Sequence, residues 1–315
     1  MAGYVRREYP EWSWSFSRQQ LLAGCPRRYY YNYYGSHNGW ERGAPKEAAL
    51  AYRLKKLSNL YLVLGDALHK SAYRMVERIR EGRPLPEADV VEEEIRRQLR
   101  RVWKSSRDEL ELFIRRPNRV DMLQEFYYQM EIREDTLAKI NGRIKQVSVG
   151  LAASDVWAEL TAPDAEIVAS EQFDTFPIDG TPVYAVPDLL YRTGDNVWKI
   201  VDWKTGEEVE DNRDQVALYA LYVQNKHGVS ASRISARLEY LSLKTSQQLT
   251  FSTEDLQKVE EGAKASMEEM RRLLLDPERN VPRAKEAFAL TEQRGLCPWC
   301  NFYELCREEL ELSVS

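Results

Sequence analysis

The sequence predicts an α/β protein with a mixed central β-sheet flanked by helices, an N-terminal helical part and a helical insertion. Three observations predict this class. Residues 17–80 and 87–145 carry helical patterns of apolar and charged residues, and residues 165–204 change to the two-residue period of strands. A helical stretch, 214–226, then separates these strands from another at 235–244, which can therefore return parallel by a crossover.

The composition is typical of a soluble globular protein. Of the 315 residues, 43% are apolar and 30% are charged, and the formal net charge is −5. That charge gives no global sign of a nucleic-acid partner, so a polyanion would have to meet local basic patches. No apolar run is long enough to cross a bilayer and no apolar signal segment begins the chain, so we expect a cytoplasmic protein with no membrane partner. We expect a single domain, 1–315, that contains the insertion 87–145.

The N-terminal part is expected to be helical. Ser17 can cap a helix that continues through the tyrosine-rich stretch 29–34. A second helix is expected over 47–80 with an interruption at Gly65, because its apolar residues recur at three- and four-residue steps. His69 projects from this second helix.

The stretch 87–145 follows two prolines and is highly charged, with a break near Pro117. Its alternating charges predict helix, and we interpret it as a helical insertion or lid. Some of its basic residues could form a face that follows phosphates, although their acidic neighbours make an ordinary solvated helix an equal alternative. These basic residues are Arg96, Arg97, Arg100, Arg101 and Lys104.

Strands are expected at 165–173, 181–192 and 196–204. The turn signals Asp179-Gly180 and Gly194-Asp195 lie between them, so we expect three antiparallel strands in sequence. After the crossover helix and its parallel strand, the pattern predicts one further long helix before a proline-bearing linker.

Acidic residues and a lysine gather at one edge of the predicted sheet. Asp188 lies within one strand, and Asp202 and Lys204 end the next. Adjacent antiparallel strands can set the two aspartates side by side, and residues two apart in a strand share a face. Two converging carboxylates suit Mg²⁺ or Mn²⁺, and a lysine can steer water or offset charge on a phosphate. Taken singly, each could be an ordinary turn or surface residue.

Four further polar residues are candidates for the same site. Gln215 and Tyr219 lie four apart on the following helix, so they share a face and could brace the site or touch a nucleic-acid backbone. His69 could join them, although a lone helical histidine is more often a surface or core residue. Glu171 could reach a metal or the substrate, or form a structural salt bridge.

The chain has four cysteines: Cys25 near the N-terminus, and Cys297, Cys300 and Cys306 in CPWCNFYELC near the C-terminus. A local triplet with one distant thiolate favours an iron-sulfur cluster over zinc, whose structural sites typically use two local ligand pairs. A disulfide pair and four unrelated thiols are the other interpretations, and a disulfide needs an oxidising compartment. We expect the segment 297–306 to pair with Cys25 in one cluster site.

Together, these motifs resemble a known nuclease family. The segments are GCPRRYYY, GDALH, VPD, DWKTG, QVALY and CPWCNFYELC. They occur in the order seen in the RecB-type PD-(D/E)XK nucleases, from about Ser15 to Cys306. More narrowly, the chain is similar to the iron-sulfur subgroup that includes the AddB nuclease domain and the CRISPR-associated single-domain nucleases. It departs from the family in GDALH, where GTxxH is common, and at Val186, where glycine is common.

The resemblance implies a restriction-endonuclease-like core, Mg²⁺ or Mn²⁺ as a cofactor, and metal-dependent hydrolysis of DNA. The implied metal ligands are His69, Asp188, Asp202 and the carbonyl of Trp203. The implied catalytic and supporting residues are Lys204, Asp188, Asp202, Gln215 and Tyr219. The four cysteines would bind a 4Fe-4S cluster that joins the two ends of the chain.

The relatives generally act on single-stranded ends, so the resemblance favours an exonuclease on single-stranded DNA. Arg27, Arg28 and the tyrosines after them could contact a strand, although a packed aromatic core is the preferred interpretation for most of these rings. The chain has no phosphate-binding loop for a nucleotide, so a helicase, CRISPR or DNA repair partner would be a separate chain. The alternative function is a non-catalytic DNA-binding or scaffold subunit of a repair, CRISPR or defence complex.

Overall fold

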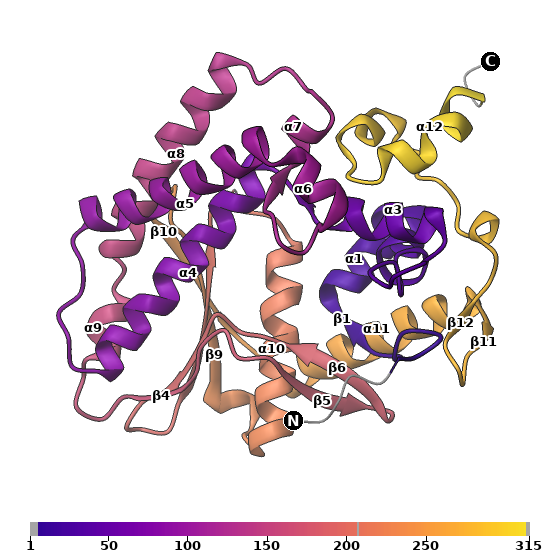
Figure 1. The fold of residues 1–315 in the computed structure, drawn as a ribbon. Coiled ribbons are helices and arrows are strands. Elements are labelled where there is room, and N and C mark those ends of the chain that lie inside the picture. Colours follow the sequence, from indigo (N-terminus) through magenta and orange to yellow (C-terminus); the bar gives the residue numbers. More distant parts are fainter. Residues whose placement is uncertain (1–5, 207, 313–315) are drawn as a thin grey trace. The chain divides into compact units, whose positions relative to one another are not determined.

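A computed structural model describes residues 6–206 and 208–312 (Figure 1). The chain divides into two compact units. The first contains the segments up to Ser58, Lys104–Met130 and from Ala265 onward, and the second contains Asn59–Trp103 and Glu131–Lys264. Among the described residues, no helix is both long and apolar enough to cross a membrane.

The second unit contains a mixed five-stranded sheet. Its strands, in spatial order, are β10 (Thr245–Thr250), β9 (Ile234–Tyr240), β8 (Trp198–Lys204), β7 (Leu189–Arg192) and β4 (Glu166–Ala169). β8 and β9 are parallel, and the other neighbours are antiparallel. The mixed α/β class predicted from the sequence is therefore confirmed.

The parallel pair depends on the crossover helix α10 (Asp211–His227), which packs against both β8 and β9 (Figure 1). Its residues from Val216 to Val223 are all buried. Gly228 ends the helix with φ 65°, a left-handed conformation that glycine adopts without a Cβ clash. The helix and the parallel strand expected from the sequence are thus both present.

The strand predictions need three corrections. Residues 181–192 form two strands, β6 (Thr181–Ala185) and β7, because the ladder breaks around Pro187, which has no N–H to donate. β6 pairs with β5 (Asp174–Ile178), a strand that the sequence analysis missed. The turn Asp179-Gly180 joins them with positive φ at both residues, as in a tight hairpin. β10 was also missed, because its sequence is polar and mostly exposed.

Helix α4 (Leu60–Arg80) carries His69 and packs against α8 (Glu134–Ala152). The predicted interruption at Gly65 is wrong. The helical pattern is interrupted at residues 56–59 instead, where Asn59 caps the start of α4 with its side-chain oxygen. A single glycine costs only about 1 kcal/mol within a helix, so Gly65 is tolerated there.

The charged stretch 87–145 is largely helical. It contains α5 (Ala88–Asp108), α6 (Leu110–Arg115), α7 (Gln124–Tyr127) and the first part of α8. Arg96 pairs with an acidic side chain at 2.8 Å, and Arg100 pairs with another at 2.5 Å. These contacts match an exposed helix with internal ion pairs, so at least these two arginines already have anionic partners.

In the first unit, segments from both ends of the described chain share one core. The unit begins with α1 (Phe16–Gly24), α2 (Pro26–Tyr30) and a π-helical turn, Tyr31–Gly35. Ser15 caps α1 by accepting a hydrogen bond from the Arg18 N–H, so the predicted cap at Ser17 is off by two residues. One core cluster consists of Tyr31, Ala51, Leu54, Leu57, Phe113, Val120, Met122, Phe302 and Cys306. Its members come from all three segments of the unit, so apolar packing holds these segments together.

The other elements are short or lie outside the candidate site. They are β1 (Trp14–Ser15), α3 (Lys46–Lys55), β2 (Leu57–Ser58), β3 (Met122–Leu123), α9 (Val156–Leu160), α11 (Thr253–Arg272), β11 (Leu274–Asp276), β12 (Val281–Pro282) and α12 (Tyr303–Leu312), with 3₁₀ turns at Ala231–Arg233, Lys285–Ala287 and Arg294–Trp299. β2 and β3 form a short parallel pair, and β11 and β12 an antiparallel one.

Arg27 is a structural residue, which corrects the expectation that it contacts a DNA strand. Its side chain is 4% exposed; Nε donates to the Phe288 carbonyl at 2.9 Å, and Nη1 donates to the two Glu309 carboxylate oxygens at 2.6 and 2.8 Å. The buried tyrosines of this stretch are Tyr29, Tyr31 and Tyr34. The packed aromatic core is therefore confirmed for these three rings, while Arg28 is exposed.

Replacing Arg27 with alanine is expected to destabilise the protein by about 2–3 kcal/mol, because charged hydrogen bonds to Phe288 and Glu309 are lost in a buried site. The exposed Arg28→Ala variant is the matched control, with an expected change within about 0.5 kcal/mol. Urea unfolding measures both. A fully stable Arg27→Ala protein with weakened DNA binding would contradict the structural role and restore the original expectation.

Candidate active site

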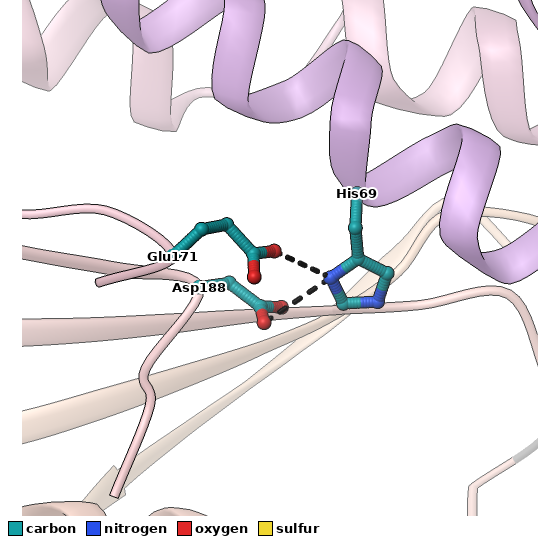
Figure 2. A group of neighbouring side chains, drawn as sticks. All are labelled: His69, Glu171 and Asp188. Carbon is teal, nitrogen blue, oxygen red and sulfur yellow. Dashed lines mark hydrogen bonds and ion pairs between the residues drawn. The ribbon is translucent and has the colours of Figure 1, made fainter. Parts of the chain in front are cut away.

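The candidate site lies in the second unit, where α4, the chain before β7, the end of β8 and α10 meet. Figure 2 shows His69 projecting from α4 toward Glu171 and Asp188. His69 Nδ1 lies 3.0 Å from Glu171 Oε1 and 3.2 Å from Asp188 Oδ1. Within the described residues, this is the one group of three or more histidine, cysteine or acidic ligand atoms that all lie within 4.8 Å of one another.

Glu171 is held in this group by its backbone. It follows the end of β4 rather than lying in a strand, with φ 49°, and its N–H donates to the Asp188 carbonyl at 3.3 Å. The Ser170 hydroxyl donates to the same carbonyl at 2.9 Å. These two hydrogen bonds hold Ser170 and Glu171 against Asp188, which directly precedes β7. The sequence analysis considered Glu171 but could not foresee this irregular turn.

Asp188 comes directly before β7, not inside a strand as expected. It is 6% exposed, and its Oδ2 accepts a hydrogen bond from the Trp203 N–H at 2.8 Å. In the β7–β8 register, Leu189 pairs with Val201, so Asp188 and Asp202 come next to each other at the end of the ladder. The two aspartates are therefore neighbours, as expected, although β7 begins at Leu189, one residue after Asp188.

Asp202, Lys204, Gln215 and Tyr219 form a connected polar chain. Lys204 Nζ lies 2.7 Å from Asp202 Oδ2 and donates to Gln215 Oε1 at 2.8 Å. Gln215 Nε2 in turn donates to the Tyr219 hydroxyl at 2.8 Å. The two-residue period of β8 and the four-residue step on α10 bring these side chains together, as the sequence pattern predicted. The contacts fix where the lysine ammonium lies.

The buried charges of the site act strongly on one another. Burial raises the pKa of Asp202, and the negative charge of Asp188 raises it further, while Lys204 opposes both. Burial and the same two carboxylates raise the pKa of Tyr219 well above its usual value. Tyr219 is therefore a neutral hydroxyl at physiological pH. The excess of carboxylates over cations gives this site a negative charge that a divalent cation can offset.

The donor set fits a hard divalent cation. Asp188 and Glu171 offer carboxylate oxygens, which Mg²⁺ and Mn²⁺ prefer, and His69 adds a nitrogen. Asp202 is 1% exposed, and its Oδ2 lies 2.7 Å from the Lys204 ammonium, so a further buried carboxylate lies beside this donor set. The Trp203 carbonyl stays a predicted ligand.

Binding of Mn²⁺ is expected to release a proton from His69. Burial lowers the pKa of His69, but the charges and hydrogen bonds of Asp188 and Glu171 outweigh burial and raise it to about 11 in the metal-free protein. A ligand nitrogen must be unprotonated, so below that pKa the apparent affinity for Mn²⁺ should rise about tenfold per pH unit for each proton released. Calorimetry in two buffers with different ionisation enthalpies measures the number of protons.

The control for this measurement is a pair of histidine variants. His69→Gln should release one proton fewer than the wild-type protein, whereas His37→Gln, in the first unit, should release the same number. Equal proton release by His69→Gln and the wild-type protein would show that His69 does not give up a proton to the metal.

The four cysteines all belong to the first unit, and none of them forms a disulfide. Cys25 Sγ caps α2 by accepting from the Arg28 N–H at 3.4 Å, and Cys300 Sγ accepts from the Phe302 N–H at 3.4 Å. Burial raises the pKa of Cys306 to about 12, with smaller contributions that include Cys300 and Cys25. In the part of the chain that the structure describes, the four sulfurs do not form a group within 4.8 Å. They influence one another electrostatically, and the cluster remains a prediction.

The chain matches the family model of the PD-(D/E)XK nuclease superfamily over residues 13–307. It therefore belongs to this superfamily, whose restriction-endonuclease-like fold agrees with the mixed α/β structure. The matched range includes the whole polar site and the four cysteines. Membership indicates a nuclease, and nucleases of this superfamily use divalent metals such as Mg²⁺ or Mn²⁺. No match was found among curated proteins.

Proposed function

We propose that the chain is a RecB-type nuclease that hydrolyses DNA phosphodiesters with Mg²⁺ or Mn²⁺ at the site around Asp188 and Asp202. One observation carries this proposal: two neighbouring aspartates lie at the ends of adjacent strands, with Lys204 held beside them by Asp202 and Gln215. Such an arrangement serves phosphoryl chemistry, because catalysis there consists mainly of positioning and of offsetting negative charge.

Asp188, Asp202, His69 and Glu171 would hold the cation, which would lower the pKa of a bound water and offset charge on the phosphate. Lys204 would donate a hydrogen bond from its ammonium to a phosphate oxygen or orient the attacking water. Gln215 keeps this ammonium in place through its Oε1, and the hydroxyl of Tyr219 fixes the orientation of the Gln215 amide. Hydrolysis adds water across one phosphodiester, so one product ends in a phosphate monoester and the other in a hydroxyl.

Two finer parts of the proposal concern the substrate and the cysteines. We infer exonucleolytic action on single-stranded DNA, because the relatives that the motifs resemble act on such ends and because a net charge of −5 works against gripping a whole duplex. We also infer a structural 4Fe-4S cluster on the four cysteines. Support comes from their spacing and from their common place in one unit. A helicase, CRISPR or repair partner chain would supply any motor.

The alternative is a non-catalytic DNA-binding or scaffold subunit. The complete set of Asp188, Asp202 and Lys204, with its contacts to Gln215, argues against this alternative. A subunit that binds DNA without cleaving it has no need for a lysine that is fixed by Asp202 and Gln215, with Gln215 in turn held by Tyr219.

Digestion of end-labelled DNA tests the proposed function. Single-stranded, blunt duplex and covalently closed duplex substrates are incubated with Mg²⁺, Mn²⁺ or a chelator, and the product lengths are measured over time. We expect metal-dependent cleavage that is faster on single strands, with short products from an end. Equal or faster cleavage of closed duplex would overturn the single-strand preference, and no cleavage of any substrate would favour the scaffold alternative.

A further inference from the structure

A cavity of about 550 Å³ adjoins the candidate metal ligands in the second unit. Its lining includes His69, Lys70, Tyr73 and Arg80 of α4, together with Glu171 and Gln172. Figure 2 shows two of these lining residues, His69 and Glu171, facing each other beside Asp188. A volume of this size is in the range of small-ligand sites, so the cavity has room for a nucleotide beside the reacting phosphate.

Three of these lining residues, His69, Tyr73 and Arg80, form a row along α4 that we call the track. His69, Tyr73 and Arg80 are four and seven residues apart, so they lie within one face of the helix. At 1.5 Å per residue, Tyr73 lies about 6 Å along the axis from His69, and Arg80 about 16 Å. At about 3.4 Å per stacked nucleotide, the track is long enough for about five nucleotides.

An aromatic ring lies beside basic side chains in this cavity lining, and the carboxylate partners of these side chains can be replaced by a phosphate. Tyr73 is 39% exposed and lines the cavity, so part of this residue is accessible to a base there. Lys70 pairs with Asp66 and Arg80 with Glu77, each at 2.5 Å and on the surface. Exposed ion pairs of this kind contribute only about 0–1 kcal/mol, so a phosphate can replace the carboxylate partner at little cost. The next residue after Gln172 is Phe173, whose side chain is 81% exposed.

We propose that this cavity binds the single DNA strand next to the scissile phosphodiester, with a base stacked on Tyr73 and the backbone contacted by Lys70 and Arg80. The inference rests on the proposed nuclease function and assigns the part of the substrate that the metal site does not hold. An aromatic face beside a row of cations is the usual arrangement for binding single strands without sequence preference. A duplex buries both faces of its internal bases, so Tyr73 selects against it.

The test compares tyrosine variants of the full chain. Tyr73→Ala should weaken binding of a single-stranded oligodeoxynucleotide about 5- to 150-fold, the range expected for losing one base–aromatic stack. Tyr73→Phe should stay within about twofold, because the ring is kept. Tyr61→Ala is the matched control: Tyr61 is on the same helix and 45% exposed, but does not line the cavity. Fluorescence anisotropy with Ca²⁺ in place of Mn²⁺ gives the affinities, and melting temperatures verify folding.

Two further readouts make the result decisive. A 2-aminopurine base in the oligonucleotide should lose fluorescence on binding to the wild-type and Tyr73→Phe proteins, but not to Tyr73→Ala. Arg80→Gln should reduce the slope of log affinity against log salt by about 0.7, as for one phosphate contact on a single strand. Wild-type affinity and quenching in Tyr73→Ala, or an equal loss in Tyr61→Ala, would overturn the inference.

Failure of the inference and failure of the proposed function give different results. If the wild-type protein cleaves DNA but Tyr73→Ala binds and cleaves like it, the nuclease function stands and the strand lies elsewhere. If no metal supports cleavage by the wild-type protein, the proposed function fails, while the Ca²⁺ binding comparison still decides whether the cavity holds a strand.

Discussion

Lys204→Ala is expected to lower the single-turnover rate of DNA cleavage by about a hundredfold to a thousandfold, the usual effect of removing one charge-stabilising donor. The variant loses the ammonium that lies between Asp202 and Gln215. DNA affinity should change little, because a single ammonium is a small part of the contact with a phosphate backbone. Rates are measured with enzyme in excess over end-labelled single-stranded DNA, and affinities by anisotropy in Ca²⁺.

The matched control is Lys199→Ala, because Lys199 is on the same strand but pairs with Glu159 at 2.5 Å, away from the aspartates. Its cleavage rate should be close to that of the wild-type protein. Gln215→Ala should lower the cleavage rate less than Lys204→Ala. This variant removes one hydrogen bond of the Lys204 ammonium but keeps the ammonium itself. Wild-type cleavage by Lys204→Ala would show that the active site lies elsewhere in the chain.

Protein purified without oxygen is expected to contain iron and acid-labile sulfide in equal amounts, and Cys25→Ala is expected to lose both along with much of its stability. A metal site that joins distant parts of a chain contributes directly to the free energy of folding. Iron, sulfide and zinc are measured on the same samples, together with unfolding by urea. Stoichiometric zinc without sulfide would contradict the cluster.

Cys25→Ser separates the two contributions of this cysteine. Cys25 Sγ also caps α2, and the loss of a cap costs about 1 kcal/mol. Serine is a good helix cap but a poor ligand for a soft metal centre. If the cluster stabilises the protein, Cys25→Ser should be nearly as unstable as Cys25→Ala. Recovery of wild-type stability in Cys25→Ser would show that only the cap matters.

Much of the site could be predicted because short-range periodicity determines it. The two-residue step from Asp202 to Lys204 and the four-residue step from Gln215 to Tyr219 determine which side chains share a face. A crossover helix after a buried strand allows the next strand to run parallel, and the parallel pairing of β8 with β9 agrees with that expectation. Local rules of this kind do not depend on the rest of the fold.

What could not be predicted depends on irregular backbone or on distant partners. The turn at Glu171, with positive φ, places its carboxylate against His69, and no sequence rule gives a glutamate this conformation. The burial of Arg27 depends on Glu309, near the other end of the chain. From the sequence, an arginine beside tyrosines could contact DNA, but the partner of Arg27 is a carboxylate of the protein itself.

The most direct test of the central claim is anomalous diffraction from crystals of the active protein soaked in Mn²⁺. We expect a manganese peak about 2 Å from carboxylate oxygens of Asp188 and Asp202, with His69 or Glu171 completing the ligand set. Mn²⁺-dependent cleavage by the same preparation, with a manganese peak elsewhere and none between these two aspartates, would contradict the assignment of this site as the metal centre.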